Sequence, residues 1–179
     1  MLFRSAAVFE AFVAKHLARQ LAAPYSLKAQ ASNFSLVRHK KQDWFRLKPD
    51  LLIWESAKNR LVLDTKWKLI DSAKANGSDK YGLSQEDFYQ LHAYGQNYLD
   101  SQGDVVLIYP KTDAFEKALP VFEFPKSTGL RLWVLPFCLK NKRLLLPECG
   151  SLDAYFYPPY LVNHARNEIA NEPKEMALI

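Results

Sequence analysis

Residues 49–66 read PDLLIWESAKNRLVLDTK, so two apolar runs carry acidic residues and a lysine at their ends. The runs LLIW and RLVL have the composition of β-strands, and the polar segment ESAKN between them has the length of a hairpin loop. If these strands pair antiparallel, Asp50 at the start of the first lies opposite Asp64 at the end of the second. Lys66 follows Asp64 by two residues, and alternate side chains of a strand share one face. The stretch therefore predicts two carboxylates and one amine gathered in one place.

This grouping suits the metal-dependent cleavage of a phosphodiester. Such cleavage needs an activated water molecule and neutralisation of developing negative charge, and Mg²⁺ prefers oxygen ligands. Asp50 and Asp64 are the expected Mg²⁺ ligands, with the Thr65 backbone carbonyl as a further ligand and Mn²⁺ as an alternative ion. Lys66 is expected to orient or deprotonate the water, or to stabilise the developing charge. On this motif alone a structural interpretation stands beside the catalytic one, because Asp-x-Lys occurs by chance and Pro-Asp is a common turn dipeptide.

The bulk composition sets broad limits. A chain of 179 residues with 49% hydrophobic residues is long enough for one domain with a proper core. Its net charge of +5 is compatible with a polyanionic partner, although many ordinary enzymes are this basic. Cys138 and Cys149 fit neither a disulfide framework nor a zinc finger, which favours structural thiols in a reducing compartment. The N-terminus lacks the order of a signal peptide and no apolar run approaches the roughly 20 residues of a membrane helix, so we expect a cytoplasmic protein without a membrane contact.

The remaining sequence alternates helical and strand patterns. Before the acidic stretch, the expected elements are a helix at 5–21 closed by Pro24, and a strand pair or one long strand at 34–47. After it come a loop at 71–82, a helix from the N-cap Ser84 (with Asp87 three residues on) to about residue 99, and a buried central strand at 104–109 that Pro110 ends. Two further strands are expected at 121–124 and 130–135, the second of which Pro136 ends or marks as an edge. This order predicts an α/β fold around a mixed sheet, with a domain at 1–150 and a C-terminal extension at 151–179 that is not a separate domain.

A second group of polar residues lies on the helix predicted after the strand pair. Gln90 and Tyr94 are four residues apart and therefore share one helix face. Gln90 borders an apolar stripe that includes Phe88 and Leu91, and its amide is within reach of the carboxylates or of a phosphate. An isolated Gln-x-x-x-Tyr pair is more often a surface pair, but this one gains weight because it follows the two carboxylates.

Taken together, these residues resemble the PD-(D/E)xK nuclease superfamily, in the variant that carries a Gln-x-x-x-Tyr motif. More narrowly, the sequence resembles the McrC-type nuclease domain of the McrBC 5-methylcytosine restriction system over roughly residues 3–140. The resemblance rests on the segments 8–13, 47–50, 63–68 and 87–94. It implies a restriction-endonuclease-like α-β-β-β-α-β core, in which helices flank a mixed central sheet, and a Mg²⁺-dependent endonuclease that acts on double-stranded DNA.

The resemblance also implies a role for each site residue. Asp50 and Asp64 resemble the metal ligands, Lys66 the catalytic lysine and Gln90 the glutamine of the motif. Glu10 resembles the first-helix acid that completes some of these sites, as a catalytic residue and metal ligand. The alternative for Glu10 is a salt bridge to a cation at the edge of the core, because its helical neighbours place it against the apolar face.

One departure from the family concerns the partner. The family's restriction subunit has a further N-terminal region that engages an AAA+ GTPase, whereas this sequence begins close to the nuclease helix. The resemblance implies a McrB-type motor as a partner, but this departure leaves coupling to the motor open. The alternatives are a fragment, a truncated homologue or a protein that works without the motor. Methylcytosine specificity stays open, and the sequence has no P-loop with which to hydrolyse GTP itself. The rival functions are a stand-alone nuclease of the same type and a catalytically silent module that binds DNA or protein.

Basic residues surround the predicted site. They are expected to hold DNA phosphates without reading sequence. The predicted DNA-binding residues are Lys41, Arg46, Lys48, Lys68 and Tyr94, within a wider set that includes Arg38, Lys40, Lys74 and Lys80. The cluster at 38–48 fits a solvated strand face equally well. Trp44 and Trp67 are candidates for base stacking, but buried aromatic side chains are the simpler expectation for both.

Overall fold

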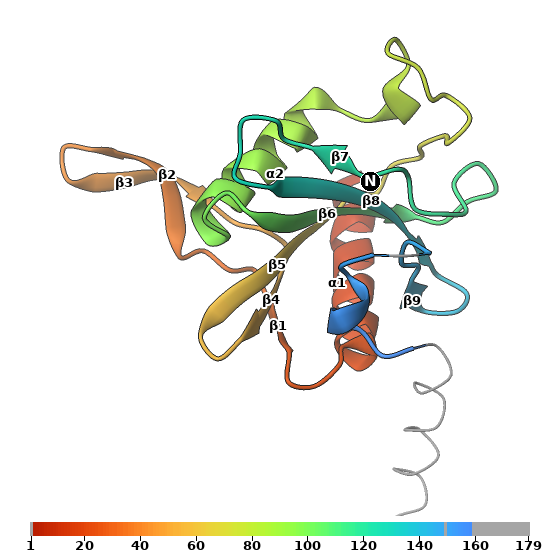
Figure 1. Ribbon diagram of the computed structural model, residues 1–179, viewed down its shortest axis with the longest axis horizontal. Helices are drawn as coiled ribbons and strands as arrows, with labels where there is room; N and C mark the ends of the chain where they lie inside the picture. The colour runs from red at the N-terminus through yellow and green to blue at the C-terminus, as the bar shows by residue number, and fades with distance from the viewer. Residues whose placement is uncertain (1, 149, 159–179) are drawn as a thin grey trace, which may run out of the picture.

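A mixed β-sheet with one long helix on each face forms the body of the protein (Figure 1). The structure is a computed structural model that describes residues 2–148 and 150–158. The helical elements are α1 (Leu2–Gln20), the short 3₁₀ helix η1 (Lys80–Gly82), α2 (Gln85–Tyr98) and the short 3₁₀ helix η2 (Asp153–Tyr155). The strands are β1 (Ser26–Ala29), β2 (Phe34–His39), β3 (Gln42–Leu47), β4 (Leu51–Glu55), β5 (Lys58–Thr65), β6 (Gly103–Pro110), β7 (Phe122–Glu123), β8 (Leu130–Cys138) and β9 (Arg143–Leu144).

The strand order confirms the predicted α/β class. In the described residues the main sheet has the order β1-β4-β5-β6-β8-β7, with β9 also paired to β8. Strands β1, β4 and β5 pair antiparallel, whereas β5-β6 and β6-β8 pair parallel, so the sheet is mixed. The path α1, β1, β4, β5, α2, β6 is the expected α-β-β-β-α-β order, and β2 and β3 form a separate two-stranded sheet inserted into it. Strand β1 was not predicted, because its four residues are too few to show an alternating pattern.

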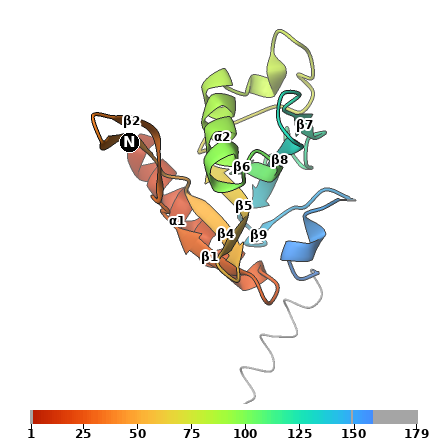
Figure 2. The same cartoon turned by 60° about the vertical axis from the view of Figure 1, so that its left-hand side comes forward.

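The two helices cover opposite faces of the sheet (Figure 2). Alternate strand side chains point to opposite faces, so each strand contributes to two separate cores. The core beneath α1 includes Val13, Leu17, Leu51, Ile53, Leu61, Leu63, Val106 and Ile108. The core beneath α2 includes Leu91, Tyr94, Leu52, Val62, Val105, Leu107 and Val134. Strand β6 is consequently buried on both faces, as its apolar sequence predicts.

The predicted antiparallel hairpin is formed by β4 and β5, with Leu51 paired to Leu63. Its loop is shorter than expected, because β4 continues to Glu55 and β5 begins at Lys58. The two connecting residues, Ser56 and Ala57, have φ values of 49° and 61°. Turns of this kind usually contain Asn-Gly, so the sequence Ser-Ala gave no signal for so tight a connection.

The strand that contains Pro136 is longer than predicted. Strand β8 continues through Pro136 to Cys138, and Pro136 lies opposite Tyr109 of the parallel neighbour β6. The Pro136 carbonyl accepts a hydrogen bond from the Leu145 amide at 3.0 Å. In an extended residue the backbone nitrogen and carbonyl point to the same side of the strand. The Pro136 nitrogen, which has no hydrogen to donate, therefore points toward Leu145 and away from β6, so no hydrogen bond between β6 and β8 is lost. The proline therefore neither ends this strand nor marks an edge.

The residues after 150 pack onto the body as far as they are described. Leu152 and Phe156 are 0% and 4% exposed and belong to the core beneath α1. Cys149 and residues 159–179, which make up most of the predicted C-terminal extension, lie outside the described residues. Within the described part, neither long helix has the apolar length that a membrane span requires.

Candidate functional site

Asp50 and Asp64 lie side by side at one end of the sheet. The pairing of Leu51 with Leu63 sets Asp50, the residue before β4, opposite Asp64 near the end of β5. The Asp50 amide faces the Asp64 carboxylate, with 3.4 Å between the nitrogen and Oδ1. Val62 packs in the core beneath α2, so Asp64, two residues later, points to the α2 face. The predicted juxtaposition of the two acids is therefore confirmed in geometry.

Thr65 fixes the orientation of the Asp50 carboxylate. The Thr65 amide and hydroxyl both donate to Asp50 Oδ2, at 2.8 Å and 2.7 Å. This contact crosses between the two antiparallel strands, so neither strand alone would hold the side chain. Thr65 thus has a defined positioning role, while the predicted use of its backbone carbonyl as a metal ligand stays a prediction.

The electrostatic environment of Asp64 is unfavourable for a carboxylate. Its side chain is 4% exposed, and burial together with the nearby Asp50 charge raises its pKa to about 6, although Lys66 opposes the shift. Asp104 is another buried carboxylate on the sheet. It is 5% exposed but accepts hydrogen bonds from Trp133 Nε1 at 2.9 Å and from Arg131 Nη2 at 3.2 Å. The Asp104 pattern is that of a satisfied structural acid, whereas the Asp64 pattern is typical of a site that receives a cation.

Lys66 is held by three oxygen atoms of different side chains. Its Nζ lies 2.8 Å from Asp64 Oδ2 and 3.4 Å from Asp87 Oδ1, and it donates to Gln90 Oε1 at 3.0 Å. Burial lowers the pKa of Lys66, but the Asp64 and Asp87 carboxylates outweigh this effect and the pKa is raised overall. Lys66 is therefore a fixed ammonium ion at neutral pH. Of the roles predicted for it, stabilising charge or orienting water fits this state better than deprotonating water.

The Gln90 and Tyr94 pair forms a hydrogen-bonded chain behind Lys66. Gln90 Nε2 lies 2.9 Å from the Tyr94 hydroxyl, which donates to the Lys48 carbonyl at 3.1 Å. Tyr94 is only 3% exposed, and burial followed by the charges of the two site aspartates raises its pKa. Gln90 thus reaches the site through Lys66, as its predicted position on the helix indicated. Tyr94 connects α2 to the segment that leads into Asp50, and this burial contradicts its predicted contact with DNA.

Asp87 is a site residue that the sequence did not reveal. It precedes Gln90 by three residues, so both side chains lie on one face of α2. In addition to its contact with Lys66, it accepts from the Tyr109 hydroxyl at 3.4 Å. The sequence marked Asp87 only as a helix-start residue. The spacing of three residues between Asp87 and Gln90 places both side chains on one helix face, and this spacing alone could have identified Asp87 as a site residue.

Glu10 lies at the edge of the site and contacts Gln30. The Gln30 side-chain amide donates to Glu10 Oε1, and the Gln30 backbone amide donates to the Asp50 carbonyl at 2.9 Å. Partial burial and the Asp50 charge raise the pKa of Glu10, while the bond from Gln30 lowers it. The partner of Glu10 is therefore an amide rather than the cation considered from the sequence. Gln30 connects Glu10 to the Asp50 backbone, and the role of Glu10 as a ligand stays a prediction.

The donors gathered here suit a hard cation. They are carboxylate oxygens of Asp50 and Asp64, which match the preference of Mg²⁺ for one or two carboxylates completed by water. Within the described residues no group of three or more His, Cys, Asp or Glu side chains has the arrangement of a metal cage. The raised pKa of Asp64 also fits, because a bound cation would relieve the repulsion between the two acids.

The remaining predicted DNA-binding residues lie at the surface. Lys41, Arg46, Lys48 and Lys68 are exposed, which leaves their proposed contacts with phosphates as predictions. Trp44 and Trp67 are 45% and 42% exposed, so the expectation that both are buried was wrong. Trp44 lies on the β2–β3 hairpin, which is not paired to the main sheet, and the Trp67 ring packs only partly, 5.3 Å from the Phe9 ring.

Two of the three comparisons with known proteins found a similarity. A search of curated proteins found no match. A solved structure is similar in fold: the refined half-complex from the tetradecameric assembly of Thermococcus gammatolerans McrB AAA+ hexamers with bound McrC. The similarity has a TM-score of 0.54 at 17% sequence identity, and it covers 92% of this chain and 33% of that chain, so this sequence spans about a third of the matched chain.

The family comparison bears on the part of the chain that carries the site. The sequence model of the McrBC 5-methylcytosine restriction system component matches residues 1–110. This range holds α1, the β4–β5 hairpin and α2, and with them the carboxylates, the lysine and the glutamine described above. The chain therefore belongs to the McrBC 5-methylcytosine restriction system component family.

Proposed function

We propose that this chain is a metal-dependent DNA endonuclease of the PD-(D/E)xK type, the cleavage component of a McrBC-like restriction system. The observation that carries the proposal is the convergence of Asp50, Asp64 and Lys66 at one end of the sheet, with Gln90 of α2 holding the lysine. Asp50 precedes β4, Asp64 and Lys66 lie at the end of β5, and Gln90 lies on α2, so packing alone gives no reason to bring the four residues together.

Each protein group has a definable task in phosphodiester hydrolysis. Asp50 and Asp64 would hold a Mg²⁺ or Mn²⁺ ion, with Glu10 and the Thr65 carbonyl as further candidate ligands. When bound, such an ion polarises the phosphate and lowers the pKa of a water molecule. Lys66, as an ammonium ion, can donate hydrogen bonds to the attacking water or to a phosphate oxygen as negative charge develops.

The residues behind Lys66 keep it in place for this task. The Lys66 Nζ contacts Asp64, Asp87 and Gln90, and Gln90 is itself braced by Tyr94. A lysine side chain that is already ordered loses little rotamer freedom when the substrate binds. We infer that Asp87 and Gln90 act on the reaction through Lys66 rather than on the substrate.

A McrB-type AAA+ motor is the proposed partner. The similar structure is described as McrB AAA+ hexamers with bound McrC, and this chain shares the fold of part of that assembly. The motor subunit would supply the nucleotide hydrolysis for which this sequence has no P-loop.

The test is cleavage of supercoiled plasmid DNA in the presence and absence of Mg²⁺. Wild-type protein is compared with Asp64→Ala and with Asp113→Ala, which removes an exposed carboxylate that is not one of the site residues described above. The reaction is run with the chain alone and with a McrB-type motor and GTP.

Three outcomes are distinguishable. Mg²⁺-dependent nicking that Asp64→Ala abolishes and Asp113→Ala retains supports the nuclease. Cleavage by the chain alone identifies a stand-alone enzyme, and cleavage only with the motor identifies a McrBC-like component. DNA binding without cleavage under both conditions would mean that the chain is a silent binding module, and the nuclease proposal would be wrong.

A further inference from the structure

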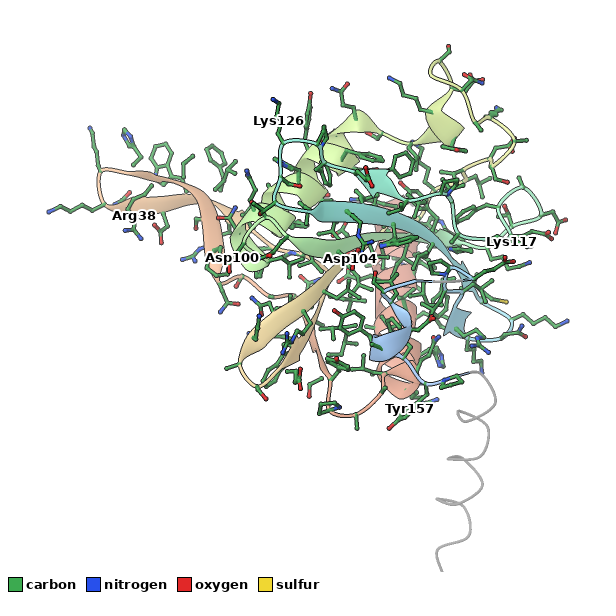
Figure 3. All side chains as sticks on the ribbon, in the orientation of Figure 1. Arg38, Asp100, Asp104, Lys117, Lys126 and Tyr157 are labelled. Atoms are coloured by element: carbon green, nitrogen blue, oxygen red, sulfur yellow. The ribbon has the colours of Figure 1, made fainter. Side chains whose placement is uncertain are left out.

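Strands β2 and β3 form a hairpin that projects from the body of the protein. We call residues 34–47 the arm. It is a two-stranded sheet of its own, not paired to the main sheet in the described residues. Figure 1 shows it extending beyond α2, and Figure 3 shows the side chains near Arg38 pointing into open space around it. The arm is inserted directly before the segment that carries Asp50.

The base of the arm is fixed to α2. The Phe34 ring packs edge-on against the Tyr98 ring, with centroids 4.8 Å apart. The Tyr98 hydroxyl donates to the Leu47 carbonyl at 2.8 Å and accepts from the Asn33 amide at 3.2 Å. Both strands of the arm are thus held where they leave the body. The base of the arm is therefore held in a defined position on α2.

Beyond this base the arm leaves large apolar side chains in contact with water. Leu36 is 52% exposed, Val37 45%, Trp44 45% and Phe45 69%. An isolated two-stranded hairpin is at best marginally stable in water, so these side chains do not form a core of their own. Val37 and Trp44 are cross-strand partners on one face of the arm, and Leu36 and Phe45 alternate with them along the strands. Exposed apolar side chains concentrated on one projecting element commonly mark an interaction site.

The net positive charge of the arm favours a negatively charged partner. The arm holds four basic residues and one acidic residue, a net charge of +3 within a whole-chain charge of +5. The basic residues are Arg38, Lys40, Lys41 and Arg46, and the acid is Asp43, which pairs with Arg38 at 2.8 Å. Protein interfaces deplete charge from their centre, whereas basic groups interleaved with exposed aromatic rings suit a nucleic acid.

We propose that the arm binds duplex DNA beside the cleavage site and thereby positions the substrate. Lys40 and Lys41 form the turn at its tip and contact phosphates, while Trp44, which packs 4.8 Å from the His39 ring, contacts sugars or base edges. A two-stranded ribbon fits the major groove of B-DNA. Gln42 and Asp50 are eight residues apart, at most about 26 Å, so the tip reaches DNA up to about eight base pairs from the scissile phosphate. This inference rests on the proposed nuclease function.

The test measures binding of the full chain to a fluorescent duplex of about 30 base pairs at several salt concentrations, without Mg²⁺ so that no cleavage occurs. The variants are Lys40→Ala with Lys41→Ala, and Trp44→Ala. The matched control is Lys58→Ala with Lys126→Ala. It removes two exposed lysines at the end of the sheet away from Asp64, one at the start of β5 and one in the turn before β8. Thermal unfolding checks that each variant is folded, which is expected because all these side chains are exposed.

The proposal makes separate demands on the two arm variants. The double lysine variant should weaken binding and reduce the slope of log K against log salt by about two, because two phosphate contacts are lost. Trp44→Ala should raise the dissociation constant at an unchanged slope, because the ring makes no phosphate contact. Arm variants that bind like the control overturn the proposal, as does a wild type that does not bind the duplex. If wild type binds DNA through the arm but never cleaves it, the nuclease function alone is refuted. If the arm variants bind DNA normally but lose association with the motor, the arm is a protein-docking surface and the DNA-binding proposal is wrong.

Discussion

Replacing Asp64 with asparagine should remove a pH-dependent loss of stability from the metal-free protein. Asp64 is buried beside Asp50, and its pKa is raised from 3.8 to about 6. The native state therefore keeps the Asp64 proton to a higher pH than the unfolded state does. Stability is lost as the pH rises from about 3.8 to about 6 and stays lost above it, because the native state must then carry a buried charge.

The size of the effect follows from the shift. A change of about 2.2 pKa units corresponds to about 3 kcal/mol, of which about 2 kcal/mol falls between pH 4.5 and pH 7.5. The variant also removes a partner of Lys66, but Lys66 keeps Asp87 and Gln90 and stays charged throughout this range. That loss shifts the whole stability curve and leaves its pH dependence unchanged.

The assay is urea unfolding of wild type and Asp64→Asn in the presence of EDTA at pH 4.5, 6.0 and 7.5. The free energy of unfolding of the variant, relative to wild type, should rise by about 2 kcal/mol from the lowest to the highest pH. Asp113→Asn, at an exposed acid, is the control and should follow wild type. Parallel curves for wild type and Asp64→Asn would refute the reasoning, since they would mean that Asp64 is not a buried acid repelled by Asp50.

Three further predictions test the metal, the positioning network and the packing. At ten times its dissociation constant, Mg²⁺ should stabilise wild type by about 1.4 kcal/mol at pH 7.5 and leave Asp64→Asn unaffected, as thermal unfolding would show. Gln90→Ala should reduce plasmid cleavage about 100-fold at unchanged DNA affinity, because Lys66 loses its brace, and an unchanged rate would contradict that role. Gly95→Ala should lower the free energy of unfolding in urea by about 1–3 kcal/mol, because the new methyl group would lie 2.7 Å from Leu130 Cδ1. The control Gly77→Ala, where nothing lies within 4 Å of the new methyl group, should change it little.

Helices and strands were predictable where the apolar residues follow one regular spacing, helical or strand-like. The helix that carries Gln90 and the buried strand β6 were found nearly to their ends, because apolar spacing and the Ser84 cap mark them. Short or unusual elements were not. Strand β1 has only four residues, and the turn at Ser56-Ala57 uses residues that seldom adopt positive φ. Pro136 was misjudged because its effect depends on which neighbour its nitrogen faces.

The members of the site were predictable where a motif spacing names them. Asp50, Asp64, Lys66 and Gln90 were each expected, and they lie together. Asp87 was not expected as a site residue, because an acid in the first turn of a helix already has a local explanation. The sequence likewise could not distinguish a buried tyrosine from an exposed one at 94, since both are compatible with the helix pattern.

The sequence by itself determined the chemistry that residues 49–66 make available. Two acids and a lysine at strand ends follow from alternation along a strand, which is a local property of the backbone. Only the tertiary structure decided what surrounds them: the pairing that joins Thr65 to Asp50, the helix face that holds Lys66 with Asp87 and Gln90, and the projection of the arm into solvent. These depend on contacts between residues distant in the chain, and such contacts are set by the packing of whole elements rather than by any local pattern.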